Sequence, residues 1–240
     1  MIRRISGSTA QERGQRRVLA AKSYEAFRDR LAGFDCRLCP LHEGRTRLVV
    51  DRGNPRASVL LVGEGPGAAE DRRGEAFVGA SGRLLDDMLT EAGLSPERDV
   101  LIANVVKCRP PENRAPRPAE VECCSPYLRR QLELVGPRCL VLLGATSVRY
   151  LLPEMGRQPM KNLVGRFHRS EEFAGIEVFV TFHPAFILRN RSRRGEMVQH
   201  LKSLPRSSKS PESPGDSQRP PGARERRASR TSGRGRRRPS

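Results

Sequence analysis

Four of the six cysteines in this 240-residue chain form two groups that could bind one metal centre. Cys36 and Cys39 are a C-x2-C pair, and Cys108 follows much later together with one of the adjacent Cys123 and Cys124. Four thiolates around one centre suit a structural zinc ion or a 4Fe–4S cluster. The spacing alone leaves open which metal is bound and which of the two adjacent cysteines is the ligand.

A glycine-rich segment, Gly63–Gly67, follows an apolar run and precedes two acidic residues, Glu70 and Asp71. Glycines let the backbone come close to a ligand and expose its N–H groups. The segment does not complete a dinucleotide-binding motif, because Ala68 stands where the last glycine is required. Phe77 lies in a following glycine-rich loop. An aromatic side chain at this position could stack on a flat ring of a ligand, or it could belong to a small satellite core.

Asn104 and a basic loop follow the next apolar run. A side-chain amide carries both an acceptor and donors, so Asn104 could bind the edge of a nucleobase, although an asparagine here could also form a turn. The loop contains Lys107, Arg109 and Arg114, and several prolines stiffen it. A stiff basic loop is suited to contact with a phosphate backbone.

His183 ends the last apolar run and precedes the residues P-A-F-I-L-R. A histidine at a strand end followed by apolar side chains is unusual on a surface unless something apolar is inserted into a partner. Ile187 or Leu188 could enter a duplex at the place that a base has left, and Arg189 could hold a phosphate group.

These residues must be positioned by the apolar runs that precede them. Four runs are predicted to be strands buried on both faces: Ser58–Gly63, Val100–Val106, Arg138–Gly144 and Ile176–Phe182. Helical patterns lie between them at Ser81–Ala92, Pro118–Leu134 and Ala145–Leu152. The alternation predicts a three-layer α/β/α sandwich around a central four-stranded, mostly parallel sheet. Ligands bind such sheets at the carboxyl ends of the strands, where the candidate residues lie.

Lysine and arginine together number 45 and aspartate and glutamate 27, which gives a formal net charge of +18. This charge implies a polyanionic partner, with DNA or RNA favoured over a membrane surface. The apolar runs are far shorter than the roughly 20 residues of a membrane-spanning helix, and the segment Met1–Arg17 has no apolar centre typical of a secretory signal. We therefore expect a cytoplasmic, nucleoid-associated monomer with reduced thiols.

Composition divides the chain into three parts. Residues 1–21 are expected to be flexible, and residues 22–204 are expected to form one α/β domain. Residues 205–240 are rich in Pro, Ser, Gly and Arg and contain few large apolar side chains. This composition predicts a disordered basic tail, which could bind phosphate or simply be solvated.

Taken together, these motifs resemble those of the family 4 uracil-DNA glycosylases, the iron–sulfur type within the uracil-DNA glycosylase superfamily. The resemblance covers residues 36–204 and rests, in order, on C-x2-C, G-E-G-P-G-x2-E-D, F-V-G, N-V-V-K-C-R-P-P, C-x-P-Y-L, L-L-G-A-T and F-H-P-A-x-x-L-R-N. It implies a 4Fe–4S cluster bound by Cys36, Cys39, Cys108 and Cys124, the last being the cysteine of C-x-P-Y-L.

The same resemblance implies how the other candidate residues act on uracil. Phe77 would stack on the base, Asn104 would hydrogen-bond its polar edge, and His183 would donate to its O2 atom. Glu64 and Glu70 would line the pocket near the attacking water and the C5 atom of the base.

The expected reaction is hydrolysis of the bond between uracil and deoxyribose, which starts base-excision repair. The nucleotide must first leave the stacked duplex. Gly65 stands where other branches of the superfamily carry a catalytic aspartate, so charge on uracil O2 is expected to be stabilised by His183 and by N–H groups of Gly65 to Gly67. Glu64 is the first candidate for positioning the water and Glu70 the second. No lysine is clearly placed for a Schiff base, so we expect a monofunctional enzyme.

A second hypothesis is a non-catalytic nucleic-acid-binding protein. In that case the cysteines would hold zinc or a cluster as a structural element, and the basic loops would bind phosphate. The visible absorbance of an iron–sulfur cluster would separate the first possibility from the second.

Overall fold

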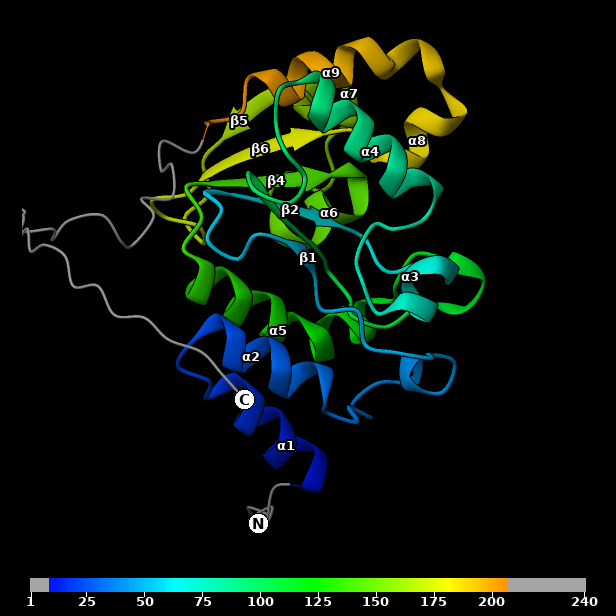
Figure 1. The fold of residues 1–240 in the computed structure, drawn as a ribbon, viewed down its shortest axis with the longest axis vertical. Coiled ribbons are helices and arrows are strands. Elements are labelled where there is room, and N and C mark those ends of the chain that lie inside the picture. The colour runs from blue at the N-terminus through cyan, green and yellow to red at the C-terminus, as the bar shows by residue number, and fades with distance from the viewer. Residues whose placement is uncertain (1–8, 207–240) are drawn as a thin grey trace, which may run out of the picture. The chain divides into compact units, whose positions relative to one another are not determined.

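The computed structural model describes residues 9–206, and its centre is a six-stranded sheet in the order β1-β3-β2-β4-β6-β5 (Figure 1). The inner strands are β2 (Val59–Gly63), β3 (Val100–Asn104), β4 (Cys139–Leu143) and β6 (Glu177–Thr181). All neighbouring pairs among them are parallel, which confirms the predicted four-stranded parallel sheet.

Two short edge strands, β1 (Arg52–Gly53) and β5 (Arg166–His168), pair antiparallel with β3 and β6. The sequence did not predict them. They are two and three residues long, and none of their positions is fully buried. Neither strand therefore shows the apolar run by which the inner strands were recognised.

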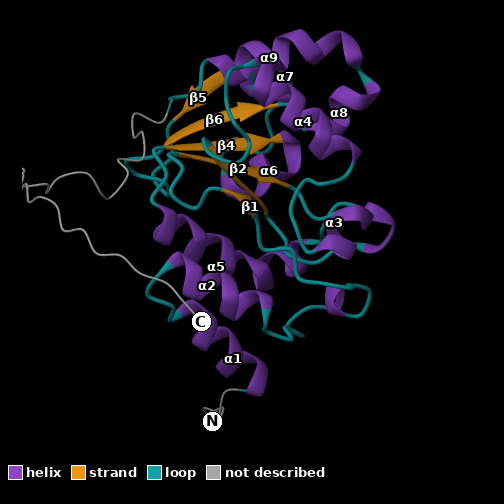
Figure 2. Cartoon of the chain, in the orientation of Figure 1, coloured by secondary structure: helices purple, strands orange, loops and turns teal. Residues whose placement is uncertain are grey.

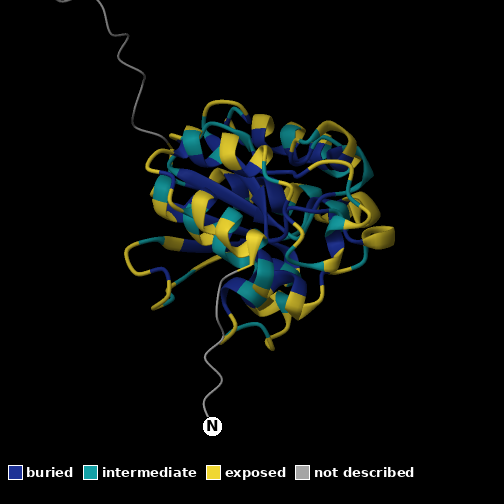
Figure 3. Ribbon diagram, turned by 90° about the horizontal axis from the view of Figure 1, so that it is seen from below, coloured by how far each residue is buried: buried dark blue, intermediate teal, exposed yellow. Residues whose placement is uncertain are grey.

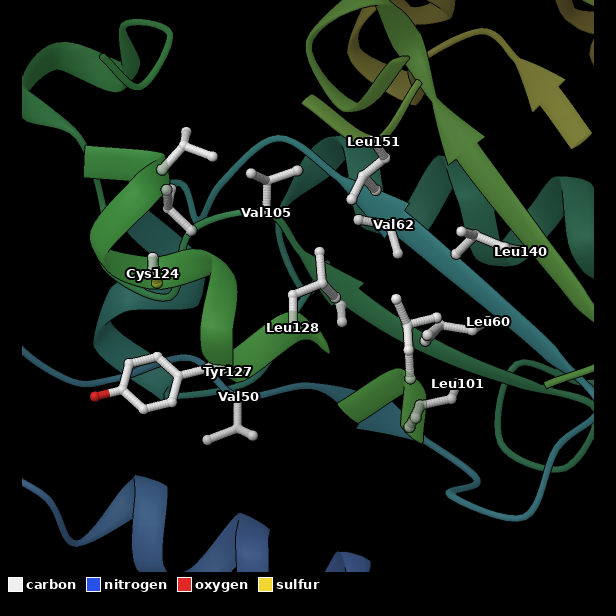
Figure 4. Packing of buried hydrophobic residues seen from close by; sticks show 14 of the residues in the cluster. Val50, Leu60, Val62, Leu101, Val105, Cys124, Tyr127, Leu128, Leu140 and Leu151 are labelled. Carbon is white, nitrogen blue, oxygen red and sulfur yellow. The ribbon is translucent and has the colours of Figure 1, made fainter. Parts of the chain in front are cut away.

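Each inner strand contributes to two hydrophobic cores, because successive side chains of a strand point to opposite faces of the sheet. In β2, Leu60 and Val62 belong to the first core, whereas the residues on either side of Leu60 belong to the second. Figure 4 shows part of the first core, in which Leu60, Leu101 and Leu140 of three strands lie on one side of Leu128 of α5. Burial on both faces explains why these strands are continuous apolar runs.

Helices cover both faces of the sheet and complete the predicted three layers (Figures 1 and 2). On one face lie α4 (Ala80–Glu91), α8 (Pro184–Arg189) and α9 (Arg194–Lys202). On the other lie α5 (Pro118–Val135) and α6 (Gly144–Leu151), with α2 (Tyr24–Ala32) and α1 (Ala10–Leu19) packed against α5. The short helices α3 (Ala68–Arg73) and α7 (Met160–Leu163) lie in connecting segments. Figure 3 shows the sheet buried between helices with exposed outer surfaces.

The long helix α5 shows why the predicted boundaries are close to the observed ones. It begins at Pro118, and the preceding N–H of Arg117 donates to the Glu120 carboxylate at 2.7 Å. It ends before Gly136, whose φ of 56° is readily adopted by glycine. Helix-start and helix-stop residues of this kind are visible in a sequence without knowledge of tertiary contacts.

The segment Ala10–Leu19 is a helix, where the composition predicted a flexible segment. Thr9 accepts a hydrogen bond from the Glu12 N–H at 3.2 Å, and the Glu12 carboxylate accepts one from the Thr9 N–H at 2.7 Å. This reciprocal capping stabilises the first turn, and Val18 is only 2% exposed. The many arginines of this segment hid that signal.

Parts of the predicted termini lie outside the described residues, namely residues 1–8 and the tail beyond residue 206. Within residues 9–206, no helix has the length and apolar character needed to cross a lipid bilayer.

Candidate active site

A cavity of about 580 Å³ opens at the carboxyl ends of the four parallel strands. Its lining includes these predicted residues: Glu64, Gly65, Gly67, Glu70, Phe77, Asn104, Arg114, His183 and Arg189. They come from the segments that follow β2, β3 and β6, while Thr146 is contributed by the start of α6 behind β4. Parallel strands bring these distant segments together because all of them end at the same edge of the sheet.

Asn104 ends β3 and is 1% exposed. Its Oδ1 atom is buried and has no hydrogen-bond partner among the described residues. A Cβ atom on Gly63 would lie 2.7 Å from this oxygen and 2.5 Å from the ring of Phe77, so only glycine lets the amide and the ring sit this close to β2. A buried acceptor without a partner destabilises a fold by about 1–3 kcal/mol. The oxygen is therefore suited to accept a hydrogen bond from a ligand.

Phe77 belongs to the second core and also forms a wall of the cavity. Its backbone φ is 55°, in the left-handed region that few residues other than glycine adopt. Gly82 makes this conformation possible, because a Cβ atom there would lie 1.8 Å from the Phe77 carbonyl oxygen. The Phe77 and His183 ring centroids are 5.7 Å apart. The strained backbone thus places an aromatic face next to the imidazole.

His183 immediately precedes α8, and its Nδ1 atom accepts a hydrogen bond from the N–H of Ala185 at 3.1 Å. Burial, with a smaller contribution from Arg189, lowers the pKa of His183 to about 4. The imidazole is therefore neutral at pH 7. Because Nδ1 is an acceptor, the single ring proton is on Nε2, which can donate to a ligand.

The two candidate glutamates have different surroundings. The Glu70 carboxylate accepts the N–H of Gly79 at 2.7 Å and the N–H of Gly67 at 3.1 Å, so it holds two glycine loops together. Glu64 accepts a hydrogen bond from the hydroxyl of Thr146. Glu64 is therefore better suited than Glu70 to hold a water molecule. Thr146 received no role from the sequence, although the L-L-G-A-T motif contains it.

The contact between Glu70 and Gly67 also corrects one expectation. The sequence predicted that N–H groups between Gly65 and Gly67 would stabilise charge on a ligand. Gly67 does line the cavity, but its N–H already donates to Glu70. This N–H group is consequently part of the loop structure, and Gly65 remains the glycine of this segment that could serve a ligand.

Only one of the two residues predicted to form an apolar wedge is exposed. Ile187 is 1% exposed and belongs to the second core, whereas Leu188 is 37% exposed. Ile187 is on the side of α8 that packs in the second core, and Leu188, about 100° further round the helix, is outside it. Ile187 is therefore a core residue and not a DNA contact.

The basic loop after β3 also differs from the expectation in one respect. Arg114 lines the cavity and pairs with Glu120 at 2.6 Å, and Arg109 lines an adjacent hollow. Lys107, by contrast, is fully buried with 0% exposure and adds no charge to the loop surface. Its contacts lie behind Asn104, away from the cavity.

The four predicted cysteine ligands lie in one region. Cys36, Cys108 and Cys124 are buried in the first core, and Cys39 packs against it. Cys123 lies near Cys36 and Cys39 as well, so proximity alone does not choose between Cys123 and Cys124. The two differ in burial, because Cys123 is only half-buried.

Hydrogen-bond donors point at three of these sulfurs. The hydroxyl of Tyr127 donates to Cys36 Sγ at 3.4 Å, and Arg45 donates to Cys108 Sγ at 3.6 Å. The backbone N–H of Lys107 donates to Cys124 Sγ at 3.3 Å. A sulfur that accepts hydrogen bonds is favoured as a thiolate, which is the form that binds metal.

Burial raises the pKa of Cys108 to about 11 and that of Cys124 to about 12. Without a cation these buried thiols stay protonated, so an iron-containing group would supply the positive charge that the site otherwise lacks. Within residues 9–206, no three His, Cys, Asp or Glu side chains are arranged to hold a single metal ion. The chemistry of the donor set, four thiols of which three accept hydrogen bonds at sulfur, suits ligation of iron by thiolates. Cys139, which is not among these four residues, is fully buried in the second core.

Comparison with known proteins gives consistent matches. The family model described as the uracil DNA glycosylase superfamily matches residues 50–203. A type-4 uracil-DNA glycosylase from Pyrobaculum aerophilum is 43% identical over 171 residues, which cover 70% of this chain and 86% of the relative. One from Thermotoga maritima is 45% identical over 157 residues, which cover 65% of this chain and 80% of the relative.

Proposed function

This chain belongs to the uracil-DNA glycosylase superfamily, and from that premise we propose that it is a uracil-DNA glycosylase of the iron–sulfur type. It hydrolyses the N-glycosidic bond of deoxyuridine in DNA and leaves an abasic site, the step that starts base-excision repair. The main support is one arrangement of three groups in the cavity: the Phe77 ring, the unpaired Oδ1 atom of Asn104 and the neutral imidazole of His183.

Asn104 selects the base. A uracil that has left the stack lies against Phe77, its N3–H donates to Asn104 Oδ1, and its O4 accepts from the amide nitrogen of the same side chain. Cytosine has an acceptor at N3 and donors at its amino group, so it would place two acceptors against each other. A site built to bind one hydrogen-bonding pattern rejects the reversed pattern strongly, because a buried polar atom is left unpaired.

His183 acts on the leaving group. As the glycosidic bond breaks, electrons move onto the base, and negative charge accumulates on uracil O2. The Nε2–H of the neutral imidazole donates to that oxygen, and its position is fixed by the hydrogen bond from Ala185 to Nδ1. A fixed donor at a developing negative charge typically contributes about 10²–10³ in rate.

Water attacks the sugar carbon from which the base departs. Glu64 holds this water through its carboxylate, and the Thr146 hydroxyl orients the carboxylate. Glu70 keeps the two glycine loops in register and thereby shapes the pocket beside the base. Since no lysine lines the cavity in the described part of the chain, the reaction ends at the abasic product without a Schiff base.

DNA contacts surround the cavity. Arg114 and Arg189 lie in its wall and bind the phosphates next to the displaced nucleotide, while Arg109 extends this contact to the adjacent hollow. Leu188 is the exposed apolar side chain of α8 and fills the space from which the base has moved.

The proposed cofactor is a 4Fe–4S cluster held by Cys36, Cys39, Cys108 and Cys124. When bound, it supplies a rigid link among the N-terminal segment, the loop after β3 and α5. The hydrogen bonds that three of these sulfurs accept support this assignment.

The test is incubation of the purified protein with a single-stranded oligonucleotide that contains one uracil, followed by alkali. We expect strand scission at the uracil and none in the matched oligonucleotides with cytosine or thymine. The variant Asn104→Ala should excise uracil far more slowly than the wild type and still bind the oligonucleotide. Binding without scission above a heat-inactivated control would overturn the proposal and favour the non-catalytic DNA-binding hypothesis.

A further inference from the structure

Lys107 is a buried lysine that the reaction above does not use. A lysine is almost never fully buried unless it has partners, because removing an ammonium group from water is costly. Its Nζ atom donates to the backbone oxygen of Asn104 at 2.9 Å, to that of Val50 at 3.4 Å and to Oε1 of Gln131. These three acceptors match the three N–H donors of an ammonium group.

The acceptors are themselves held in place. Gln131 of α5 is fully buried, and its Nε2 donates to the Tyr24 hydroxyl at 2.9 Å. That hydroxyl donates to Asp51 at 2.6 Å, and Asp51 forms an ion pair with Arg28 at 2.5 Å. The ammonium of Lys107 is therefore anchored to α2, to α5 and to the segment before β1.

The main chain of Lys107 is tied to the cysteines. Its N–H donates to Cys124 Sγ at 3.3 Å, and its neighbour in the chain is Cys108. One residue thus contacts the thiol region through its backbone and Asn104 through its side chain. Asn104 precedes Lys107 by only three residues, so the segment between the base-binding asparagine and the contact with Cys124 is short.

We propose that Lys107 is a positioning residue that fixes the backbone of Asn104 relative to the four cysteines and so keeps Asn104 Oδ1 directed into the cavity. The chemistry of this inference rests on the proposed function. Replacing a buried charged group together with its partners by apolar side chains is often neutral or stabilising, so stability alone does not explain why this network is present. The network is better explained by the accuracy with which it places Asn104.

The test is a double-mutant cycle with Lys107→Met and Asn104→Ala, measured as the single-turnover rate of uracil excision. Lys107→Met keeps the length of the side chain and removes the three donors. We expect a rate loss of about 10²-fold, as for a small displacement of a reacting group. If Lys107 acts through Asn104, adding Lys107→Met to Asn104→Ala produces no further loss. Multiplicative losses would overturn the proposal.

A control cycle pairs Lys107→Met with Thr146→Ala, which affects Glu64 in the lining of the cavity. These two losses should multiply, because Thr146 contacts Glu64 and has no hydrogen bond to the Lys107 network among the described residues. Equal non-additivity in both cycles would indicate general damage to the site and would contradict a specific role for Lys107.

Two further measurements separate positioning from folding and do not depend on turnover. Lys107→Met should weaken the binding of free uracil in calorimetry and leave iron content and affinity for abasic DNA unchanged. If Lys107→Met does not fold, Tyr24→Phe removes only the hydroxyl that anchors Gln131, and it should show the same non-additivity with a smaller loss. An inactive wild type would refute the proposed function, whereas an active wild type with multiplicative losses would refute only this inference.

Discussion

Two polar regions meet at Asn104, and they differ in how their polar atoms are paired. Behind the residue, the ammonium of Lys107, the amide of Gln131 and the hydroxyl of Tyr24 all donate to identified protein atoms. On the cavity side, the Oδ1 atom of the same asparagine has no partner among the described residues. One residue therefore separates a paired polar network from an unpaired acceptor.

The comparison indicates where this fold accepts a cost in stability. An unpaired buried oxygen lowers the free energy of unfolding, whereas a paired network holds its members in one arrangement. The unpaired oxygen of Asn104 faces the cavity, where a ligand can donate a hydrogen bond to it. The side chains of the paired network do not line the cavity. Binding and positioning are thus assigned to opposite sides of one short segment.

The largest expected effect is on the cavity side, for His183→Ala. Loss of the Nε2–H donor should slow single-turnover excision by about 10²–10³-fold, because charge on uracil O2 is no longer stabilised. Binding to abasic DNA should stay within a few fold of the wild type. A variant that loses DNA binding and excision in parallel would contradict the assigned role and weaken the contrast between the two regions.

The same prediction extends to pH. Burial lowers the pKa of His183 to about 4, so the excision rate should show no histidine ionisation near pH 6.5 and should fall only as the pH approaches 4. The unfolded chain takes up this proton more readily than the folded chain. His183 should therefore reduce stability progressively as the pH falls from 6.5 towards 4. If the pH dependence of the wild-type rate shows a pKa near 6.5 that is absent in His183→Ala, the proposal that His183 donates as a neutral imidazole is wrong.

On the buried side, the pair Cys124→Ser and Cys123→Ser sharpens the comparison. Cys124 is buried and accepts the Lys107 N–H, whereas Cys123 is half-buried. We expect Cys124→Ser to lose most of its bound iron and sulfide, and Cys123→Ser to retain them. Chemical analysis of both elements in freshly purified protein is the measurement. The reverse pattern would show that the adjacent cysteine is the ligand.

The smallest effects on excision are expected from neighbouring residues of α8. Ile187→Ala should lower the free energy of unfolding by about 2–5 kcal/mol, because it leaves a cavity in the second core. Leu188→Ala should change stability by less than about 0.5 kcal/mol and should weaken excision from duplex DNA more than from single strands. Urea denaturation and paired excision assays measure both effects. Equal stability losses would contradict the different exposure of the two side chains.

The arrangement around the cavity was largely predictable. Each parallel strand is buried on both faces, which produces an apolar run long enough to recognise. Polar residues directly after such runs must lie at one edge of the sheet. This reasoning places Asn104 and His183 in one region without knowledge of how their side chains pack. Phe77 follows β2 only after the intervening α3, and its place beside the base was an expectation from the family resemblance.

The amino-acid pattern thus specified the inner strands, the three layers and the set of residues that meet at the strand ends, because local periodicity and chain direction are sufficient for these. It did not specify that Lys107 points inward, that Ile187 rather than Leu188 is buried, or that Gly67 donates to Glu70. Those outcomes depend on contacts between segments far apart in the chain or on the rotation of a short helix. Such contacts form only when the chain folds, so local sequence patterns do not predict them.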